Sequence, residues 1–278
     1  MRWLMLDRLG NKPLCAIDQI NKQAIANAFG RAAKGYDKSA AFQRQVGQQL
    51  LSFIPPISVF TSSTTVIDVG CGTGYFSAAL HQQGFTVTAA DLSAEMLQQA
   101  QQRCGQDCQY LQTDAENIAM SDNRYDIAFS NLALQWCDDL SVPLRELHRV
   151  VKPQGRIFFT TLVEGSLSEL TQAWSYIDDQ QHVNSFKSQT AITTEINQVG
   201  LTIESLVYEP ITVYYSTAMK LMKDLKGIGA THLQQQRRSG LFGRQTIIDL
   251  ERAYDAFRLD NGLLPATYQV CFGVLINE

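Results

Sequence analysis

The sequence lacks the features that mark several large classes of protein. No apolar run approaches the roughly 18 residues of a membrane-spanning helix, and Asp7 and Arg8 interrupt the apolar start too early for a signal peptide. A net charge of −4 and a pI of about 5.6 exclude a global basic field for nucleic acid. We therefore expect a cytoplasmic protein that binds neither membrane nor nucleic acid.

Clusters of metal ligands are also missing. Of the six cysteines only Cys104 and Cys108 lie close together, as C-x3-C, and neither a second cysteine pair nor a histidine pair accompanies them. A structural zinc site needs four such ligands, and a disulfide framework is typical of short secreted chains. The four histidines lie in no metal-binding or catalytic-triad motif. We therefore expect reduced thiols and no metal.

Short apolar runs alternate with helical patterns through the middle of the chain, whose 278 residues are 45% hydrophobic and 18% charged. This alternation predicts βαβ units and hence an α/β protein with a parallel, doubly wound sheet. The predicted strands are 64–70, 85–91, 108–114, 125–131, 156–163, 201–209 and 267–276. The predicted helices are 21–53, 75–83, 93–103, 141–151, 189–199, 216–226 and 244–258.

The long connection before the last strand decides the predicted domain organisation, because it is too long for a hairpin loop. We expect an N-terminal helical cap at 1–60, a core that binds the cofactor at 61–209, a helical lid at 210–266 and the last core strand at 267–278.

The most informative motif is VIDVGCGTGYF at 66–76, in which Gly70, Gly72 and Gly74 follow a predicted strand. Glycines at such a turn let the backbone approach a ligand closely. A dinucleotide site requires G-x-G-x-x-G. The third glycine would fall at Tyr75 or Ser77, counted from Gly70 or Gly72, so the motif does not predict a dinucleotide.

The pattern D-x-G-x-G-x-G at 68–74 resembles instead the first motif of class I S-adenosylmethionine-dependent methyltransferases. The resemblance implies a Rossmann-like sheet of seven strands with the last one antiparallel, and S-adenosylmethionine as cofactor. It also implies that Asp68 organises the methionine end and that Asp114 lies near the adenine amino group. Asp91 ends the second strand, where an acid is placed to accept from ribose hydroxyls. A capping or turn role is the alternative for Asp68 and Asp114.

Four further runs, at 28–45, 130–137, 146–174 and 225–232, together resemble the malonyl-acyl-carrier-protein O-methyltransferases of biotin synthesis. The resemblance implies methylation of the free carboxylate of a malonyl thioester on acyl carrier protein, which prepares it for elongation toward a pimeloyl precursor. The alternatives are a carboxyl methyltransferase for a small free acid and a non-catalytic nucleotide-binding regulatory module. The first fifteen residues and the glutamines at 234–236 have no counterpart in the resemblance. The predicted cofactor-binding residues are Tyr36, Gln43, Asp68, Gly70, Gly72, Gly74, Asp91, Leu92, Asp114, Ala115 and Asn131.

The reaction implied by the resemblance needs no general base, because a malonyl carboxylate is already ionised at neutral pH. The protein must instead desolvate the carboxylate and hold it near the methyl group. We therefore expect anchoring groups rather than an acid–base pair. The candidates are Arg145, Trp136, Thr231 and His232.

Positive charge gathers in the predicted lid, where residues 211–244 contain six lysines and arginines and a single acid. Such a face matches an acidic partner such as acyl carrier protein, and a solvated helix face is the alternative. Gly227 and Gly229 would let the lid backbone bend close to an acyl-pantetheine arm. The predicted docking residues are Lys220, Lys223, Lys226, Arg237 and Arg238.

Overall fold

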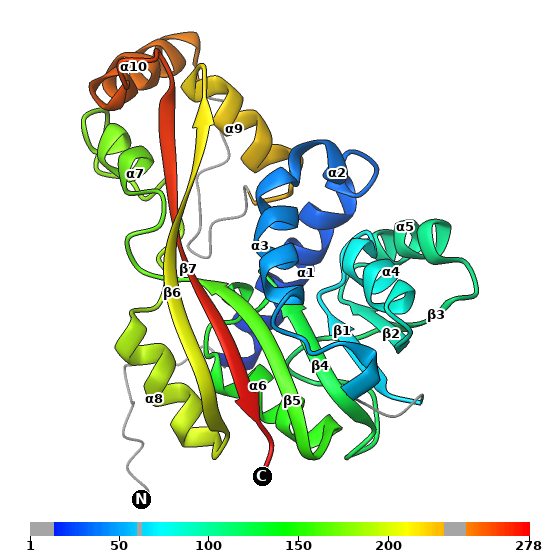
Figure 1. Cartoon of the computed structure of the whole chain (residues 1–278). Helices are drawn as coiled ribbons and strands as arrows, with labels where there is room; N and C mark the ends of the chain where they lie inside the picture. Colours follow the sequence, from blue (N-terminus) through cyan, green and yellow to red (C-terminus); the bar gives the residue numbers. More distant parts are fainter. Residues whose placement is uncertain (1–13, 60–62, 231–242) are drawn as a thin grey trace, which may run out of the picture.

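The computed structural model describes residues 14–59, 63–230 and 243–278 (Figure 1). Its centre is a seven-stranded sheet in the order β3-β2-β1-β4-β5-β7-β6. The strands are β1 Thr65–Val69, β2 Thr86–Asp91, β3 Cys108–Gln112, β4 Tyr125–Asn131, β5 Val151–Leu162, β6 Thr202–Tyr215 and β7 Leu264–Ile276. Strands β1 to β5 pair in parallel, and β7 runs antiparallel to both β5 and β6. The predicted α/β class, strand number and antiparallel last strand are confirmed.

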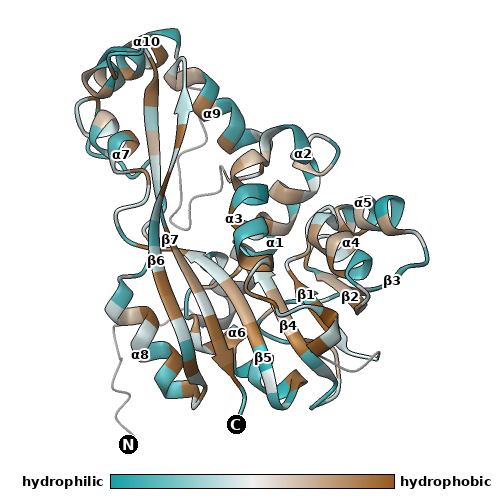
Figure 2. Ribbon diagram, viewed as in Figure 1, coloured by the Kyte–Doolittle hydropathy of each residue, from teal (hydrophilic) through white to brown (hydrophobic). Residues whose placement is uncertain are grey.

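Helices cover both faces of the sheet, which explains why central strands such as β1 and β4 are mostly apolar and buried, coloured largely brown in Figure 2. The apolar residues of α3 and α4 pack on one face with Phe129 and Phe158. Those of α6 and α8 pack on the other face with Ala128 and Phe159. These helices are α3 Ala41–Leu51, α4 Tyr75–Gln82, α6 Ser141–Val150 and α8 Gln189–Val199, with α5 Ala94–Cys104 beside β2 and β3.

The N-terminal segment differs from the single helical region predicted at 21–53. It forms α1 Leu14–Ala32, α2 Tyr36–Ser39 and α3, followed by the short η1 Ile57–Val59. The chain turns at Gly35 and again at Ala40, the residues that precede α2 and α3. These turns bring the cap helices over the carboxyl ends of β1 and β4 (Figure 1).

Strands β6 and β7 extend well beyond their neighbours and form a two-stranded ladder above the sheet (Figure 1). The predicted strand 201–209 is therefore too short, because pairing with β7 continues to Tyr215. Helices α7 Ser168–Ser175, α9 Ala218–Gly227 and α10 Arg244–Tyr254 pack around this ladder, with η3 Asp255–Phe257 next to α10. Helix α7 was not predicted, whereas α9 and α10 were. No helix in the described part of the chain is long and apolar enough to cross a membrane.

Candidate active site

The glycine turn joins β1 to α4, and its three glycines have φ of 74°, 55° and 75°. A Cβ atom built on Gly72 meets nothing within 4 Å, so this residue leaves open space for a ligand. A Cβ atom on Gly74 would lie 2.8 Å from that of Ala100. Gly74 therefore permits the close packing of α4 on α5, a role distinct from the predicted contact with a ligand.

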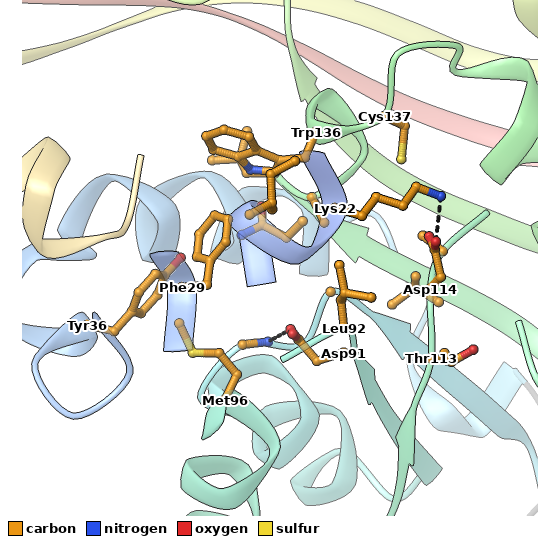
Figure 3. Close-up of a pocket in the computed structure, with 18 residues that line it drawn as sticks. Lys22, Phe29, Tyr36, Asp91, Leu92, Met96, Thr113, Asp114, Trp136 and Cys137 are labelled. Carbon is orange, nitrogen blue, oxygen red and sulfur yellow. Dashed lines mark hydrogen bonds and ion pairs between the residues drawn. The ribbon is translucent and has the colours of Figure 1, made fainter. Parts of the chain in front are cut away.

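Asp91 lies at the carboxyl end of β2 and fixes the glycine turn (Figure 3). Its Oδ2 accepts from the backbone N–H of Gly72 and its Oδ1 from that of Ser93, both at 2.8 Å. Burial raises the pKa of Asp91, and these backbone donors oppose the rise. Each carboxylate oxygen keeps capacity to accept from a hydroxyl of a bound ligand.

A pocket of about 800 Å³, including its open mouth, lies above the carboxyl ends of β1, β2 and β4. We call it the first pocket. Open α/β sheets bind ligands at this edge. The predicted residues that line it are Tyr36, Gly70, Gly72, Asp91, Leu92, Asp114, Ala115 and Asn131. These residues, predicted from separate parts of the sequence, therefore share one cavity.

Asp68 and Gln43 line a smaller recess that shares Tyr36, Gly72 and Asn131 with the first pocket. The Asp68 carboxylate accepts from the Ser77 hydroxyl at 2.6 Å, and burial raises the pKa of Asp68 to about 7. The Oε1 atom of Gln43 is buried and has no hydrogen-bond partner among the described residues. A buried acceptor of this kind calls for a ligand or water that donates to it.

A lysine that the sequence did not single out closes the far side of the first pocket. Lys22 on α1 lies 2.5 Å from Asp114 Oδ2 and also pairs with Glu116 (Figure 3). Burial lowers the pKa of Lys22, but hydrogen bonds to the two carboxylates outweigh this and raise it. The partner acids lie more than 90 positions away, so no local signal could have revealed the contact.

A second pocket of about 890 Å³ adjoins the first and shares Phe29, Tyr36, Leu132 and Trp136 with it. The rings of Phe29 and Trp136 meet edge to face at 5.2 Å (Figure 3). Leu132 has a φ of 50°, which is strained for this residue type, directly after β4. Burial and the negative charges of Asp91 and Asp37 raise the pKa of Tyr36 well above its usual value, so the phenol stays neutral.

Asn131 forms hydrogen bonds that connect α3 to the sheet beside the first pocket. Its side-chain amide donates to the Gln43 carbonyl at 3.0 Å, and its Oδ1 accepts from the Thr160 hydroxyl at 2.9 Å. These bonds tie α3 to β4 and β5. The predicted Asn131 therefore lines the first pocket while its polar atoms hold the cap in place.

The second pocket is mostly apolar and is built from segments far apart in the sequence. It takes residues from the cap, from η2 Leu134–Trp136, from α7 and the segment after it, from α9 and from β7. No lysine, arginine, aspartate or glutamate is among its described lining residues.

Of the two predicted anchors that the structure describes, Trp136 lines both pockets. Arg145 is exposed on α6 and lines neither pocket, so its predicted role has no support in the geometry. Thr231 and His232 lie outside the described residues, although the preceding Ala230 lines the second pocket.

The glycines at the end of α9 contact the cap. A Cβ atom on Gly227 would lie 2.3 Å from Ser39 Oγ. One on Gly229, whose φ is 76°, would lie 3.1 Å from the Ala28 carbonyl oxygen. The structure gives these glycines a role in packing, and their approach to an acyl-pantetheine arm stays a prediction. They let α9 pack closely on α1 and α2, a contact that the sequence pattern alone could not reveal.

Helix α9 has two different faces. Met222 and Leu225 line the second pocket, whereas Lys220, Lys223 and Lys226 are exposed. The remaining predicted docking residues, Arg237 and Arg238, lie outside the described part of the chain.

Comparison with known proteins identifies relatives of this chain. A family model described as a methyltransferase domain matches residues 67–159. The malonyl-acyl-carrier-protein O-methyltransferase of Serratia marcescens is 43% identical over 263 residues, which cover 95% of this chain and 99% of the relative. The proteins of the same name from Yersinia pestis and Salmonella typhimurium are 42% and 40% identical, covering 93% and 92% of this chain and 93% and 98% of the relatives.

Solved structures share the fold. The YcgJ protein from Bacillus subtilis has a TM-score of 0.57 at 16% identity, covering 84% of this chain and 97% of its own. Geranyl diphosphate methyltransferase in complex with S-adenosylmethionine has a TM-score of 0.52 at 17% identity, covering 85% of each chain. On the identity and coverage of the sequence relatives, this chain belongs to the malonyl-acyl-carrier-protein O-methyltransferase family.

Proposed function

We propose that this protein transfers the methyl group of S-adenosylmethionine to the free carboxylate of a malonyl thioester carried by acyl carrier protein. The product is the malonyl methyl ester that enters pimeloyl and biotin synthesis. The observation that carries the proposal is the pair of adjoining pockets, one at the glycine turn and one apolar, which share a wall of four residues.

The first pocket fits the cofactor. The open space beside Gly72 receives a ligand without steric conflict, and the buried Asp91 is placed to accept from ribose hydroxyls. Asp114 lines the same pocket, and its carboxylate keeps capacity to accept from an adenine amino group beside its bond to Lys22. When bound, S-adenosylmethionine supplies a methyl group on a positively charged sulfur. The buried carboxylates of Asp68 and Asp91 favour that charge.

The second pocket fits the acceptor because its apolar walls remove water from a carboxylate, which is a weak nucleophile while it is hydrated. The two pockets meet at a shared wall formed by Phe29, Tyr36, Leu132 and Trp136. Alignment of the carboxylate with the methyl group at this wall provides the proximity that methyl transfer requires. Tyr36 keeps its proton and can donate to the carboxylate. The arrangement requires no general base.

The exposed lysines of α9 provide a docking surface for an acidic carrier protein next to the second pocket. We extend this surface to Arg31, Lys34 and Lys38, which are exposed on and between α1 and α2. Helix α2 packs against α9, so the two sets of cations are neighbours (Figure 1). Complementary charge of this kind accelerates association and weakens as salt is added.

The proposal is tested by methyl transfer from labelled S-adenosylmethionine to malonyl-acyl carrier protein, malonyl-coenzyme A and free malonate. We expect the highest kcat/KM for the carrier protein. Highest turnover of free malonate would identify a small-acid methyltransferase instead. An absence of labelled ester from all three acceptors, combined with normal cofactor binding, would identify a non-catalytic module.

A further inference from the structure

Two tyrosines are among the described residues that line the second pocket, and the proposed function assigns a role to one of them. Tyr36 belongs to the wall shared with the first pocket, whereas Tyr268 on β7 lines the second pocket alone. Tyr268 is only 5% exposed, and its hydroxyl forms no hydrogen bond with any residue that the structure describes. A hydroxyl buried in this way calls for a ligand or water as its partner.

Tyr268 differs in this respect from the phenols near it. The Tyr254 hydroxyl donates to the Pro265 carbonyl at 2.8 Å, and the Tyr215 hydroxyl is hydrogen-bonded to the Asp224 carboxylate. Both hydroxyls therefore have partners in the described part of the chain, and neither tyrosine is among the residues that line the second pocket. Of these three phenols, Tyr268 is the one that can meet a ligand.

The fold places Tyr268 at the edge of the sheet where the first pocket opens. Pairing between β5 and β7 ends at Leu162 and Val270, so Tyr268 stands beyond the carboxyl end of β5, on the same face of β7 as Val270. Its ring stacks on Phe42 of α3, with the centroids 4.0 Å apart and the planes at 22°. Phe42 precedes Gln43, which lines both the second pocket and the recess beside the first. The stack therefore holds the phenol against the part of the cap that adjoins the cofactor site.

A malonyl thioester carries two oxygen-bearing groups, which one methylene separates. Its carboxylate has to reach the shared wall for methyl transfer, so its thioester carbonyl lies farther into the second pocket. That carbonyl is an uncharged acceptor, and burying it without a donor is costly. A phenol is a suitable donor because burial, with nearby groups such as Tyr215 and Asp224, raises the pKa of Tyr268 well above its usual value. The hydroxyl therefore keeps its proton at neutral pH.

We propose that Tyr268 donates a hydrogen bond to the thioester carbonyl of the acceptor, while Tyr36 faces the carboxylate at the shared wall. The two phenols together match the spacing of one methylene between the carbonyl and the carboxylate, which makes Tyr268 a specificity residue for malonyl thioesters. The inference rests on the proposed function. Because Tyr268 contacts the end of the acceptor that does not react, loss of its hydroxyl should weaken acceptor binding and change the methyl-transfer step little.

The test removes the hydroxyl from the protein and the carbonyl from the ligand. Acyl carrier protein is loaded with the malonyl thioester or with the 2-carboxyethyl thioether, in which a methylene replaces the carbonyl. The Kd of each is measured calorimetrically in the presence of S-adenosylhomocysteine. The proteins are the wild type, Tyr268→Phe and the control Tyr254→Phe, which removes a buried hydroxyl outside the pocket.

We expect Tyr268→Phe to weaken binding of the thioester about fivefold, as loss of one neutral hydrogen bond predicts, and to leave binding of the thioether unchanged. Its Tm should stay that of the wild type, because the hydroxyl has no partner among the described residues to lose. Tyr254→Phe should lower the Tm and keep the ratio of the two Kd values. In steady-state kinetics with malonyl-acyl carrier protein, Tyr268→Phe should raise KM about fivefold with kcat little changed.

Equal weakening of both ligands by Tyr268→Phe would overturn the inference, and so would unchanged binding of the thioester. A wild type that binds malonyl-acyl carrier protein but forms no methyl ester would refute the proposed function instead. The two failures are distinguishable, because the binding comparison does not depend on methyl transfer.

Discussion

We expect Asp68 to make the affinity for S-adenosylmethionine depend on pH. Burial raises the pKa of Asp68 to about 7, and the hydrogen bond from Ser77 opposes part of the rise. A group with this pKa is about 9% ionised at pH 6 and about 90% ionised at pH 8. The cationic cofactor favours the ionised form, so its Kd is expected to be about tenfold larger at pH 6 than at pH 8.

The same shift fixes the sign of the stability change. The folded protein holds the Asp68 proton up to about pH 7, whereas the unfolded chain releases it near pH 4. Between these values the folded state binds more protons, so the free energy of unfolding falls as pH rises, by at most about 1.4 kcal/mol per pH unit. Asp68→Asn is expected to remove this decline.

The assay is a calorimetric titration with S-adenosylmethionine at pH 6, 7 and 8, for the wild type, Asp68→Asn and the exposed control Asp107→Asn. We expect the tenfold trend in the wild type and in the control, and a Kd constant within about twofold in Asp68→Asn. A trend that survives in Asp68→Asn would belong to another group, such as the buried Asp91, and would refute the reasoning.

Three further predictions concern the turn, the docking surface and the cap. Gly72→Ala places a methyl group in the first pocket, so cofactor titration should show at least about tenfold weaker binding. The control Gly105→Ala changes a glycine with a similar φ of 56° outside the pocket, so it should lower only the free energy of unfolding, by about 1–2 kcal/mol of backbone strain. Reversing the charge of the three exposed lysines of α9 should lower kcat/KM for malonyl-acyl carrier protein about tenfold or more at low salt, while the kinetics with malonyl-coenzyme A stay unchanged. Equal losses of kcat/KM with both acceptors would exclude a docking role. Lys22→Gln removes the ion pairs that hold α1 on the first pocket, so amide hydrogen exchange in α1 should accelerate. Unchanged protection from exchange would show that packing alone holds the helix.

The sheet could be predicted because its signals are local. A buried parallel strand is a short apolar run, and the turn after β1 needs glycine at each position of positive φ. The far end of β6 was missed although residues 211–215 are all β-branched or aromatic, because Pro210 interrupts the run. Pairing with β7 carries the strand past this proline. The contacts of Lys22 were equally hidden, because they depend on which side chains the fold brings near it.

The residues that sequence patterns predict well line mostly the first pocket, whereas the second pocket is built largely from residues that they predict poorly. The general methyltransferase model matches only residues 67–159, the part that forms the glycine turn and most of the first pocket. Most of the second pocket comes from outside that range: from the cap, from 162–186, from 222–230 and from Tyr268. Proteins that share the core can therefore share the cofactor and differ in the acceptor. It follows that substitutions in the cap and around the β6–β7 ladder should change acceptor preference while cofactor affinity stays near that of the wild type.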